Sequence, residues 1–226
     1  MTPKIFSIEG NIGAGKTTFI ENLQKFCEDN ERFDIVFLRE PVDIWDEVRD
    51  PVDGETILKK FYKNPGKYAF PFQVMAFISR LSLLEDTIKQ NPNCSVIICE
   101  RSLCADSNIF AKMLYDDELI DNVCFQIYSK IYKEFSGRFV MDGIIYMDAS
   151  PEKCFQRITK RGRDGEGEIT MEYLIKCKKY HDEWLLSNNG KTNVLHLNVD
   201  ENATYKENDV GRKWIDSCIR FIELTL

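Results

Sequence analysis

The sequence predicts an α/β domain built on a five-stranded parallel sheet with helices on both faces. Short apolar runs that are typical of buried strands alternate along the whole chain with segments whose apolar residues recur at helical spacing. Strands that alternate with helices in this way form parallel sheets. The 226 residues suffice for one well-buried domain and would be cramped for two. With no visible repeat, linker or low-complexity segment, one domain over residues 1–226 is expected.

The expected elements follow one another along the chain. Strands are predicted at residues 5–8, 33–38, 93–100, 144–148 and 194–199. Between them, helices are predicted from residue 19, over 71–90 with Pro71 in the first turn, from about residue 102, from Pro151, and over 208–224. Residues 43–67 mix polar turns with apolar side chains and are expected to form short helices and a loop.

Composition argues against several classes of protein. The net charge of −7 disfavours a general nucleic-acid surface, which needs clustered Lys and Arg, although an acidic chain can still form a local positive pocket for a small anion. Eight cysteines without a C-x-x-C pair and only two histidines argue against a zinc site and for reduced thiols. No apolar run nears the roughly 18 residues that span a bilayer, and no targeting peptide is visible. We therefore expect a cytoplasmic or otherwise intracellular protein.

The segment G-N-I-G-A-G-K-T-T at residues 10–18 follows an apolar strand and precedes a helix. It satisfies G-x-x-x-x-G-K-[ST] in the required strand–loop–helix context, which predicts a phosphate-binding P-loop rather than a turn that merely starts a helix. The glycines let backbone N–H groups surround a polyphosphate, Lys16 can reach the β- and γ-phosphates, and Thr17 can ligate Mg²⁺. A nucleoside triphosphate is therefore expected to bind Gly10, Asn11, Ile12, Gly13, Ala14, Gly15, Lys16, Thr17 and Thr18.

Two acidic residues stand at the carboxyl ends of predicted strands, where ligands bind in open α/β sheets. Glu40 follows the second strand and Glu100 ends the third. Near a P-loop, such a carboxylate can hold Mg²⁺ or accept a proton from a hydroxyl group. Asp148 ends the fourth strand, but an Ala-Ser-Pro sequence follows it, so either Asp148 or Ser150 is expected to cap the next helix.

One face of the long helix carries Gln73, Ala76 and Arg80, at positions i, i+3 and i+7. We interpret this face as a hydrogen-bonding floor for a flat ring; on pattern alone, a solvated polar stripe is the alternative.

Positive charge is concentrated between residues 157 and 163. Arg157 and Arg161 are i, i+4 neighbours, Arg163 follows, and three glycines are expected to make residues 164–168 mobile. A basic helix end that runs into a Gly-rich loop predicts a lid, at about residues 157–168, that closes over phosphates and excludes water; an ordinary solvated helix end is the alternative. Together with the P-loop, this lid favours phosphoryl transfer over mere nucleotide binding. The absence of an N-K-x-D stretch disfavours a GTPase switch.

Five motifs carry a family resemblance: the P-loop, R-E-P-V-x-x-W at 39–45, F-Q-x-x-A-x-x-S-R at 72–80, E-R-S-x-x-x-D at 100–106 and R-x-x-x-R-G-R at 157–163. In this order they resemble the deoxynucleoside kinase family, over residue 5 to about residue 186. The resemblance implies a P-loop kinase three-layer sandwich with an Arg-rich lid. It also implies transfer of the γ-phosphate of ATP to the 5′-hydroxyl of a deoxyribonucleoside, in nucleotide salvage. A homodimer is implied as well, paired through helix 71–90 and the helix after Glu100.

The resemblance further implies roles for matching residues. Glu40 would be the general base with Arg101 beside it, and Thr17 and Glu100 would hold Mg²⁺. The groups that neutralise phosphates would be Lys16, Arg157, Arg161 and Arg163. Tyr62 and Glu166 would hold the sugar 3′-hydroxyl, with Glu168 as a rival for the second place. The residues expected at the substrate, besides Ile12, are Glu40, Val42, Trp45, Tyr62, Phe72, Gln73, Ala76, Arg80, Arg101, Asp106, Phe110 and Glu166.

Substrate preference is argued from Ala76, Arg80 and Asp106. This set resembles the deoxycytidine and deoxyguanosine kinases, whereas the thymidine-directed branch has a more apolar lining. Arg80 and Asp106 would form a charged pair that meets a donor–acceptor edge and leaves little room for a thymine methyl group. We expect deoxycytidine, deoxyadenosine and deoxyguanosine to be preferred to thymidine, in an order that is left open. Ala203 stands where related kinases often have an aromatic residue near the donor base, so UTP remains an alternative to ATP.

Two other functions compete with this expectation. A nucleoside monophosphate kinase would need extra cations near Glu40 to hold the acceptor phosphate, and only Arg39 and Arg101 are obvious. A kinase-like structural subunit should have lost Lys16, Glu40 or the lid arginines, yet the chain retains them.

Overall fold

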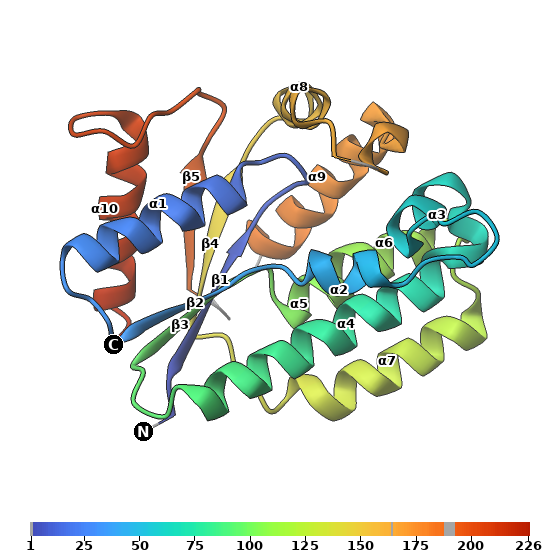
Figure 1. The fold of residues 1–226 in the computed structure, drawn as a ribbon, viewed down its shortest axis with the longest axis horizontal. Helices are drawn as coiled ribbons and strands as arrows, with labels where there is room; N and C mark the ends of the chain where they lie inside the picture. The colour runs from blue at the N-terminus through green and yellow to red at the C-terminus, as the bar shows by residue number, and fades with distance from the viewer. Residues whose placement is uncertain (1, 164, 188–192) are drawn as a thin grey trace.

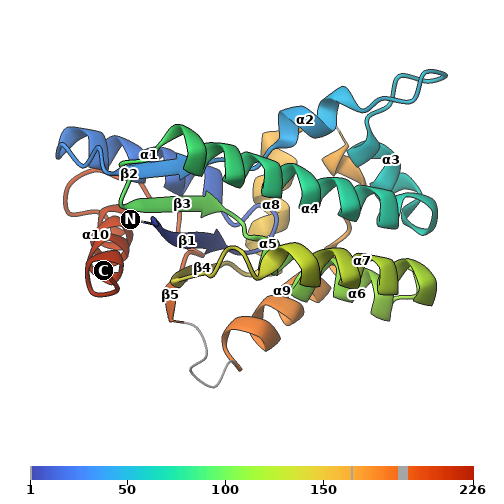
Figure 2. The ribbon, with the colours of Figure 1, turned by 90° about the horizontal axis from the view of Figure 1, so that it is seen from below.

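The computed structural model describes residues 2–163, 165–187 and 193–226; residue 164 of the predicted lid lies outside them. Within these residues, five strands form one all-parallel sheet in the order β2-β3-β1-β4-β5, visible in Figure 2. The strands are β1 (Lys4–Glu9), β2 (Ile35–Leu38), β3 (Val96–Glu100), β4 (Gly143–Asp148) and β5 (Val194–Asn198). The predicted α/β fold with a five-stranded parallel sheet is confirmed.

Helices occupy the segments between the strands (Figure 1). In chain order the described helices are α1 (Lys16–Asp29), α2 (Val42–Glu47), α3 (Ile57–Lys63), α4 (Pro65–Gln90), α5 (Leu103–Ala105), α6 (Lys112–Asp116), α7 (Asn122–Ser136), α8 (Pro151–Arg161), α9 (Met171–Leu185) and α10 (Val210–Glu223). A π-helix, η1 (Asp106–Ala111), joins α5 to α6, and a 3₁₀ turn, η2 (Glu166–Glu168), follows α8. The short helices expected between residues 43 and 67 are α2 and α3.

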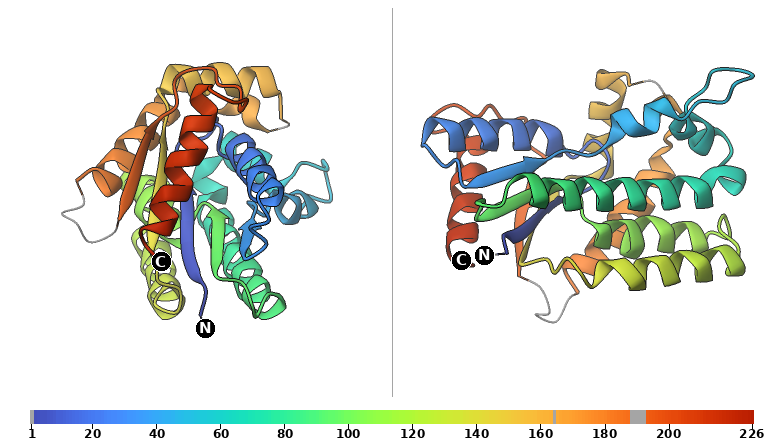
Figure 3. Two further views of the ribbon diagram at one scale, coloured as in Figure 1. Left: turned by 90° about the vertical axis from the view of Figure 1, so that its left-hand side faces the viewer. Right: turned by 60° about the horizontal axis from the view of Figure 1, so that its bottom comes forward.

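Different helices cover the two faces of the sheet. Successive strand residues point to opposite faces, so Phe6 and Ile98 pack with α1 and α10, whereas Ile5 and Ile97 pack with α4. Ile144 packs with α9 on this second face. Both faces are therefore buried, which explains why the strands are nearly continuous apolar runs. Figure 2 shows α4 and α7 running side by side past the carboxyl ends of the strands. Figure 3 shows that β1 begins and α10 ends at the opposite end of the molecule.

Several element boundaries differ from the prediction. The long helix begins at Pro65, which takes the favoured first-turn position, and Pro71 lies inside the helix. The second strand begins at Ile35; Phe33 lies in the turn after α1 and is 75% exposed, because an apolar residue can lie at the surface without joining a strand. The third strand begins at Val96 and the last helix at Val210, each after a hydrogen-bonded turn.

The helix cap left open in the sequence analysis is Ser150. Its Oγ accepts a hydrogen bond from the backbone N–H of Lys153, at the start of α8. Asp148 instead pairs with Lys178 at 3.1 Å and with His196 at 2.8 Å. Among the described residues, no helix is both long enough and apolar enough to cross a membrane.

Candidate active site

The carboxyl ends of β1, β2 and β3 open into a pocket of about 870 Å³, its open mouth included. The predicted site residues that line it are Ile12, Gly13, Gly15, Lys16, Thr17, Thr18, Glu40, Val42, Trp45, Tyr62, Phe72, Gln73, Ala76, Arg80, Glu100, Arg101, Asp106, Phe110, Arg161, Arg163 and Glu166. All five motifs contribute to this list, and Tyr62, Phe110 and Glu166 join it from outside them. The parallel sheet brings them together because its strand ends meet at one edge.

The P-loop fits a polyphosphate. At Gly13, φ is +79° and a Cβ atom would lie 2.6 Å from the carbonyl oxygen of Cys154, so only glycine fits against α8. Gly15 adopts a left-handed conformation directly before α1, whose first backbone N–H groups have no partner within the helix. Lys16 is buried, and its Nζ donates to the carbonyl oxygens of Gly10 and Asn11 at 3.2 and 3.0 Å.

Thr17 and Glu100 face each other across the tips of α1 and β3. The Thr17 hydroxyl donates to Oε1 of Glu100 at 2.7 Å. A hydroxyl and a carboxylate close together, beside a phosphate-binding loop, supply the hard oxygen ligands that Mg²⁺ prefers. These two residues fit the predicted metal site.

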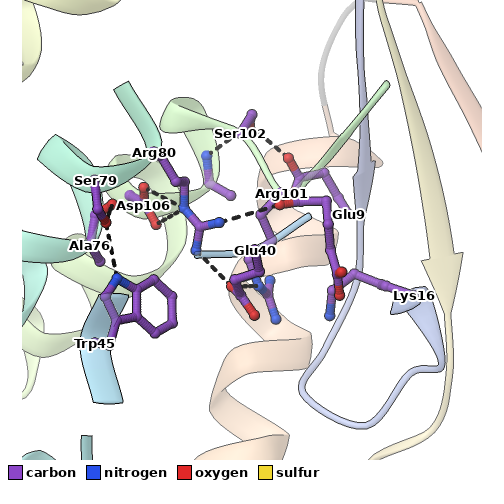
Figure 4. Close-up of polar contacts among 12 residues, drawn as sticks. Glu9, Lys16, Glu40, Trp45, Ala76, Ser79, Arg80, Arg101, Ser102 and Asp106 are labelled. Atoms are coloured by element: carbon purple, nitrogen blue, oxygen red, sulfur yellow. Dashed lines mark hydrogen bonds and ion pairs between the residues drawn. The ribbon is translucent and has the colours of Figure 1, made fainter. Parts of the chain in front are cut away.

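A buried ion-pair network joins α4, β2, β3 and η1 (Figure 4). Arg80 pairs with Oδ2 of Asp106 at 3.0 Å and with Oε1 of Glu40 at 2.6 Å, and its Nη1 donates to the carbonyl oxygen of Glu100 at 3.2 Å. Arg101 approaches the same Glu40 oxygen at 3.3 Å. Glu40 thus lies between two guanidinium groups.

Aromatic rings flank this network. Trp45 lies below the guanidinium of Arg80, 5.4 Å from ring centroid to Cζ, and its indole N–H donates to Oγ of Ser79 at 2.9 Å. Arg101 lies over the ring of Phe110 at 4.8 Å. Gln73 is buried, and its Oε1 has no hydrogen-bond partner within the described part of the chain. The pocket therefore combines flat apolar walls with an available acceptor.

The lid contributes Glu166 rather than Glu168. Glu166 is buried in the pocket wall, whereas Glu168 is exposed. Arg161 donates to both carboxylate oxygens of Glu166, the nearer at 2.6 Å, and Arg163 approaches at 3.4 Å. The turn η2 that carries Glu166 packs against α3, which carries Tyr62.

Comparisons with known proteins agree with this geometry. The family model described as "Deoxynucleoside kinase" matches residues 6–220. The chain belongs to the deoxynucleoside kinase family. It is therefore an ATP-dependent phosphotransferase that acts on deoxynucleosides.

The similarity to named relatives extends over most of this kinase. Human deoxycytidine kinase is 36% identical, over 90% of this chain and 86% of that protein. A probable deoxycytidine kinase of fowlpox virus is 37% identical, over 88% and 80% respectively. The mitochondrial deoxyguanosine kinase of Xenopus laevis is 32% identical, over 89% and 83%.

Arg157, unlike Arg161 and Arg163, does not line the first pocket. Its guanidinium donates to the carbonyl oxygens of Ala14, Val199 and Glu201 at 3.1, 2.9 and 3.0 Å. It lines a second pocket, beside α8, together with Ala203, Tyr205 and Trp214. Arg157 thus ties the P-loop to the loop after β5, and lies outside the wall of the first pocket.

Some residues of the first pocket were missed, and some predicted residues lie elsewhere. Leu58, Phe61 and Tyr173 also line the pocket. Tyr173 meets Tyr62 edge-on at 6.0 Å, but it belongs to no recognisable motif, and only the packing of α9 brings it there. Of the predicted P-loop residues, Gly10, Asn11 and Ala14 do not line this pocket; the Asn11 side chain donates to the carbonyl oxygen of Leu174 at 2.9 Å.

Burial and neighbouring charges shift the pKa values of several pocket residues, among them Lys16, Glu40 and Asp106. Burial and the charge of Arg101 lower the pKa of Lys16 to about 8. Burial would raise the pKa of Glu40, but the charges of Arg80 and Arg101 outweigh it and lower that pKa to about 2. At Asp106, burial outweighs the attraction of Arg80 and raises the pKa to about 6. At neutral pH, Glu40 is therefore ionised and most Lys16 is protonated.

Raising the pH through 8 should weaken the interaction with ATP. Lys16 is cationic below its pKa and neutral above it, so its attraction for the phosphates is lost as the pH rises. We expect kcat/KM for ATP, which reports the enzyme before ATP binds, to fall with an apparent pKa near 8. Steady-state rates at saturating deoxynucleoside measure this, with thermal unfolding over the same pH range as the control. A level profile up to about pH 9.5 would contradict the assignment.

Proposed function

We propose that the kinase phosphorylates the 5′-hydroxyl of deoxyribonucleosides and prefers deoxycytidine and purine deoxynucleosides to thymidine. The observation that carries this proposal is the buried pair of Arg80 and Asp106, which lines the same pocket as Gln73. A guanidinium, a carboxylate and an amide offer donors and acceptors to the edge of a base. Similarity to human deoxycytidine kinase and to Xenopus deoxyguanosine kinase supports the same preference.

Glu40 is proposed as the general base. It is ionised and held by two guanidinium groups at the carboxyl end of β2. Because its pKa is about 2, it is a weak base, and it takes the proton only as the hydroxyl oxygen bonds to phosphorus and becomes acidic. Most of the acceleration then comes from orientation of the hydroxyl and neutralisation of phosphate charge.

The phosphates and the sugar are assigned to different parts of the pocket wall. Lys16 and the lid arginines, Arg161 and Arg163, supply positive charge to the phosphates. Thr17 and Glu100 would hold Mg²⁺, which adds further positive charge at the β- and γ-phosphates. Tyr62 and Glu166 are proposed to bind the 3′-hydroxyl group, in agreement with the contact between α3 and η2.

The second pocket is proposed to accept the base of ATP. It adjoins the P-loop at Gly13 and Gly15 and is lined by Tyr205 and Trp214. These two rings supply aromatic surface near Ala203, where the sequence pattern lacks an aromatic residue. A purine ring can stack on such a surface.

The geometry argues against a nucleoside monophosphate kinase. Arg39, one of the two cations considered for an acceptor phosphate, is exposed outside the first pocket and pairs with Glu21 at 3.2 Å. The other, Arg101, is engaged by Glu40. The phosphate group of a nucleoside monophosphate acceptor near Glu40 would therefore have few cations available to neutralise it.

Replacing Glu40 by Gln tests the proposed base. The amide keeps the shape but cannot accept the proton, so kcat should fall by a factor of about 10²–10⁴, while ATP affinity stays within about threefold. ADP release with ATP, Mg²⁺ and deoxycytidine measures kcat, and equilibrium titration measures ATP binding. Glu47→Gln, on the exposed face of α2, is the matched control and should retain wild-type turnover. Unchanged turnover in Glu40→Gln would remove Glu40 from the base role.

Replacing Arg80 by Met and Asp106 by Ala should admit thymidine. The double variant removes the charged pair together, so no unpaired buried charge remains at either position, and it makes room for the thymine methyl group. We expect the ratio of kcat/KM for thymidine to that for deoxycytidine to rise at least about tenfold. Arg39→Met is the control and should leave the ratio unchanged. If thymidine is already the best substrate of the wild-type enzyme, the proposed preference is wrong.

We also infer a homodimer, formed through α4 and α7. The family resemblance implied the helix after Glu100 at the interface, but α5, η1 and α6 direct most of their apolar residues inward. Exposed apolar residues lie instead on α4, at Ile78, and on α7, at Val123 and Ile127. A second copy of the same surface would cover them.

Charge substitution on α7 tests this interface. Val123→Glu combined with Ile127→Glu should convert the dimer to a monomer in sedimentation velocity experiments, because ionised carboxylates are costly to bury. Leu224→Glu, at an exposed apolar position on the α10 C-cap, is the control and should leave the dimer intact. A monomeric wild-type protein, or an unchanged dimer in the double variant, would contradict the inference.

A further inference from the structure

A buried carboxylate that has no role in the proposed mechanism lies next to the P-loop. Glu9 is the last residue of β1, directly before Gly10, and its exposed fraction is 0%. Its Oε1 accepts a hydrogen bond from Oγ of Ser102 at 2.6 Å, and its Oε2 has no partner among the described residues. A buried carboxyl group with one unpartnered oxygen is destabilising. Simple core packing does not explain an acidic residue there.

Ser102 uses its hydroxyl group in both directions. Its oxygen accepts the backbone N–H of Ala105 at 3.2 Å, as the N-cap of α5. Its hydroxyl hydrogen is then donated to Glu9, because a carboxylate oxygen has no hydrogen to offer in return. The single side chain of Ser102 thus connects the tip of β1 to the first turn of α5, as Figure 4 shows.

This connection is made at a strained turn. Arg101 has a φ of 64°, in the left-handed region that costs an ordinary L-residue about 1 kcal/mol. Two hydrogen bonds hold the turn to the end of β1. The backbone N–H of Arg101 donates to the carbonyl oxygen of Ile8 at 3.1 Å, and the Ser102 hydroxyl donates to Glu9.

The strained turn determines where the side chains of Arg101 and Asp106 point. It directs the Arg101 guanidinium back toward Glu40 and over Phe110. The helix that begins after Ser102 continues into η1, where Asp106 meets Arg80. A small rotation of the turn would therefore move Arg101 relative to Glu40, and Asp106 relative to Arg80, the second arginine that pairs with Glu40.

We propose that Glu9 is a positioning residue for phosphoryl transfer. Acting through Ser102, it fixes the position of the turn at Arg101 relative to the P-loop. The residues at the acceptor hydroxyl group then face the P-loop residues that bind the phosphates. Glu9 itself does not line the pocket. This inference rests on the proposed role of Glu40 and Arg101 at the acceptor hydroxyl.

Substitutions at Ser102 supply the first test. Ser102→Ala should lower kcat by about tenfold or more, with KM for ATP changed by less than about threefold, because a displaced Arg101 affects the reaction rather than P-loop binding. Ser102→Thr retains the hydroxyl group and should recover most of kcat. Ser150→Ala removes an N-cap serine whose hydroxyl group, within the described part of the chain, has no carboxylate partner; it should lower the unfolding midpoint without a comparable loss of kcat. Equal losses of kcat in Ser102→Ala and Ser150→Ala, or no recovery with Thr, would overturn the proposal.

A double-mutant cycle supplies the second test. If Glu9 acts through Ser102, the variant with both Glu9→Ala and Ser102→Ala should have the same kcat as the slower single variant. Losses that multiply would show that the two residues act independently and would overturn the proposal. Should Glu9→Ala fail to fold, the Ser102 series decides alone. An active Glu40→Gln would overturn the proposed base without altering this cycle, so the two failures are distinguishable.

Discussion

The active site depends on the neutralisation of Arg80. Its guanidinium is buried at the carboxyl edge of the sheet and is surrounded by Asp106, Glu40 and the carbonyl oxygen of Glu100. An unpaired charge in such a place is costly, and removal of one partner of a buried pair typically destabilises a protein by about 3–5 kcal/mol. The same contacts join a helix, two strand ends and a π-helix. The contacts that neutralise Arg80 therefore also determine the shape of the pocket.

The parallel sheet and the long helix together bring these charged groups close to one another. β1, β2 and β3 end at one edge, which brings the P-loop, Glu40 and Glu100 close to one another. The helix α4 runs beyond this edge and carries Arg80 across to them (Figure 2). The π-helix adds one residue to its turn, which re-aims side chains relative to an ordinary helix, and Asp106 is its first residue. π-helices often occur at functional sites for this reason.

The lid and the P-loop are tied to the rest of the molecule by side chains that also carry charge. Glu166 gathers Arg161 and Arg163 at the pocket, whereas Arg157 binds three backbone carbonyl groups near the second pocket. Neighbouring arginines of one motif thus perform different structural tasks. Glu9 and Ser102 form a comparable tie at the start of the P-loop.

The sequence by itself determined the fold class, the P-loop and the residues that end the strands, because these depend on local patterns: apolar runs, glycine spacing and helical periodicity. Most residues of the pocket could therefore be predicted, including Gln73, Ala76 and Arg80 on one helix face. The family resemblance supplied residues such as Tyr62, which no local pattern singles out.

Only the tertiary structure decided which of these charges meet. Glu166 rather than Glu168 enters the pocket, Arg157 turns to the loop after β5, and Tyr173 joins the wall from α9. The start of α4 at Pro65 and the exposure of Phe33 likewise could not be predicted from the sequence pattern. The physical reason is that a local sequence specifies how a segment coils, whereas the partner of a side chain depends on segments brought near by packing. Glu9 is the clearest case, since its partner Ser102 is 93 residues away along the chain.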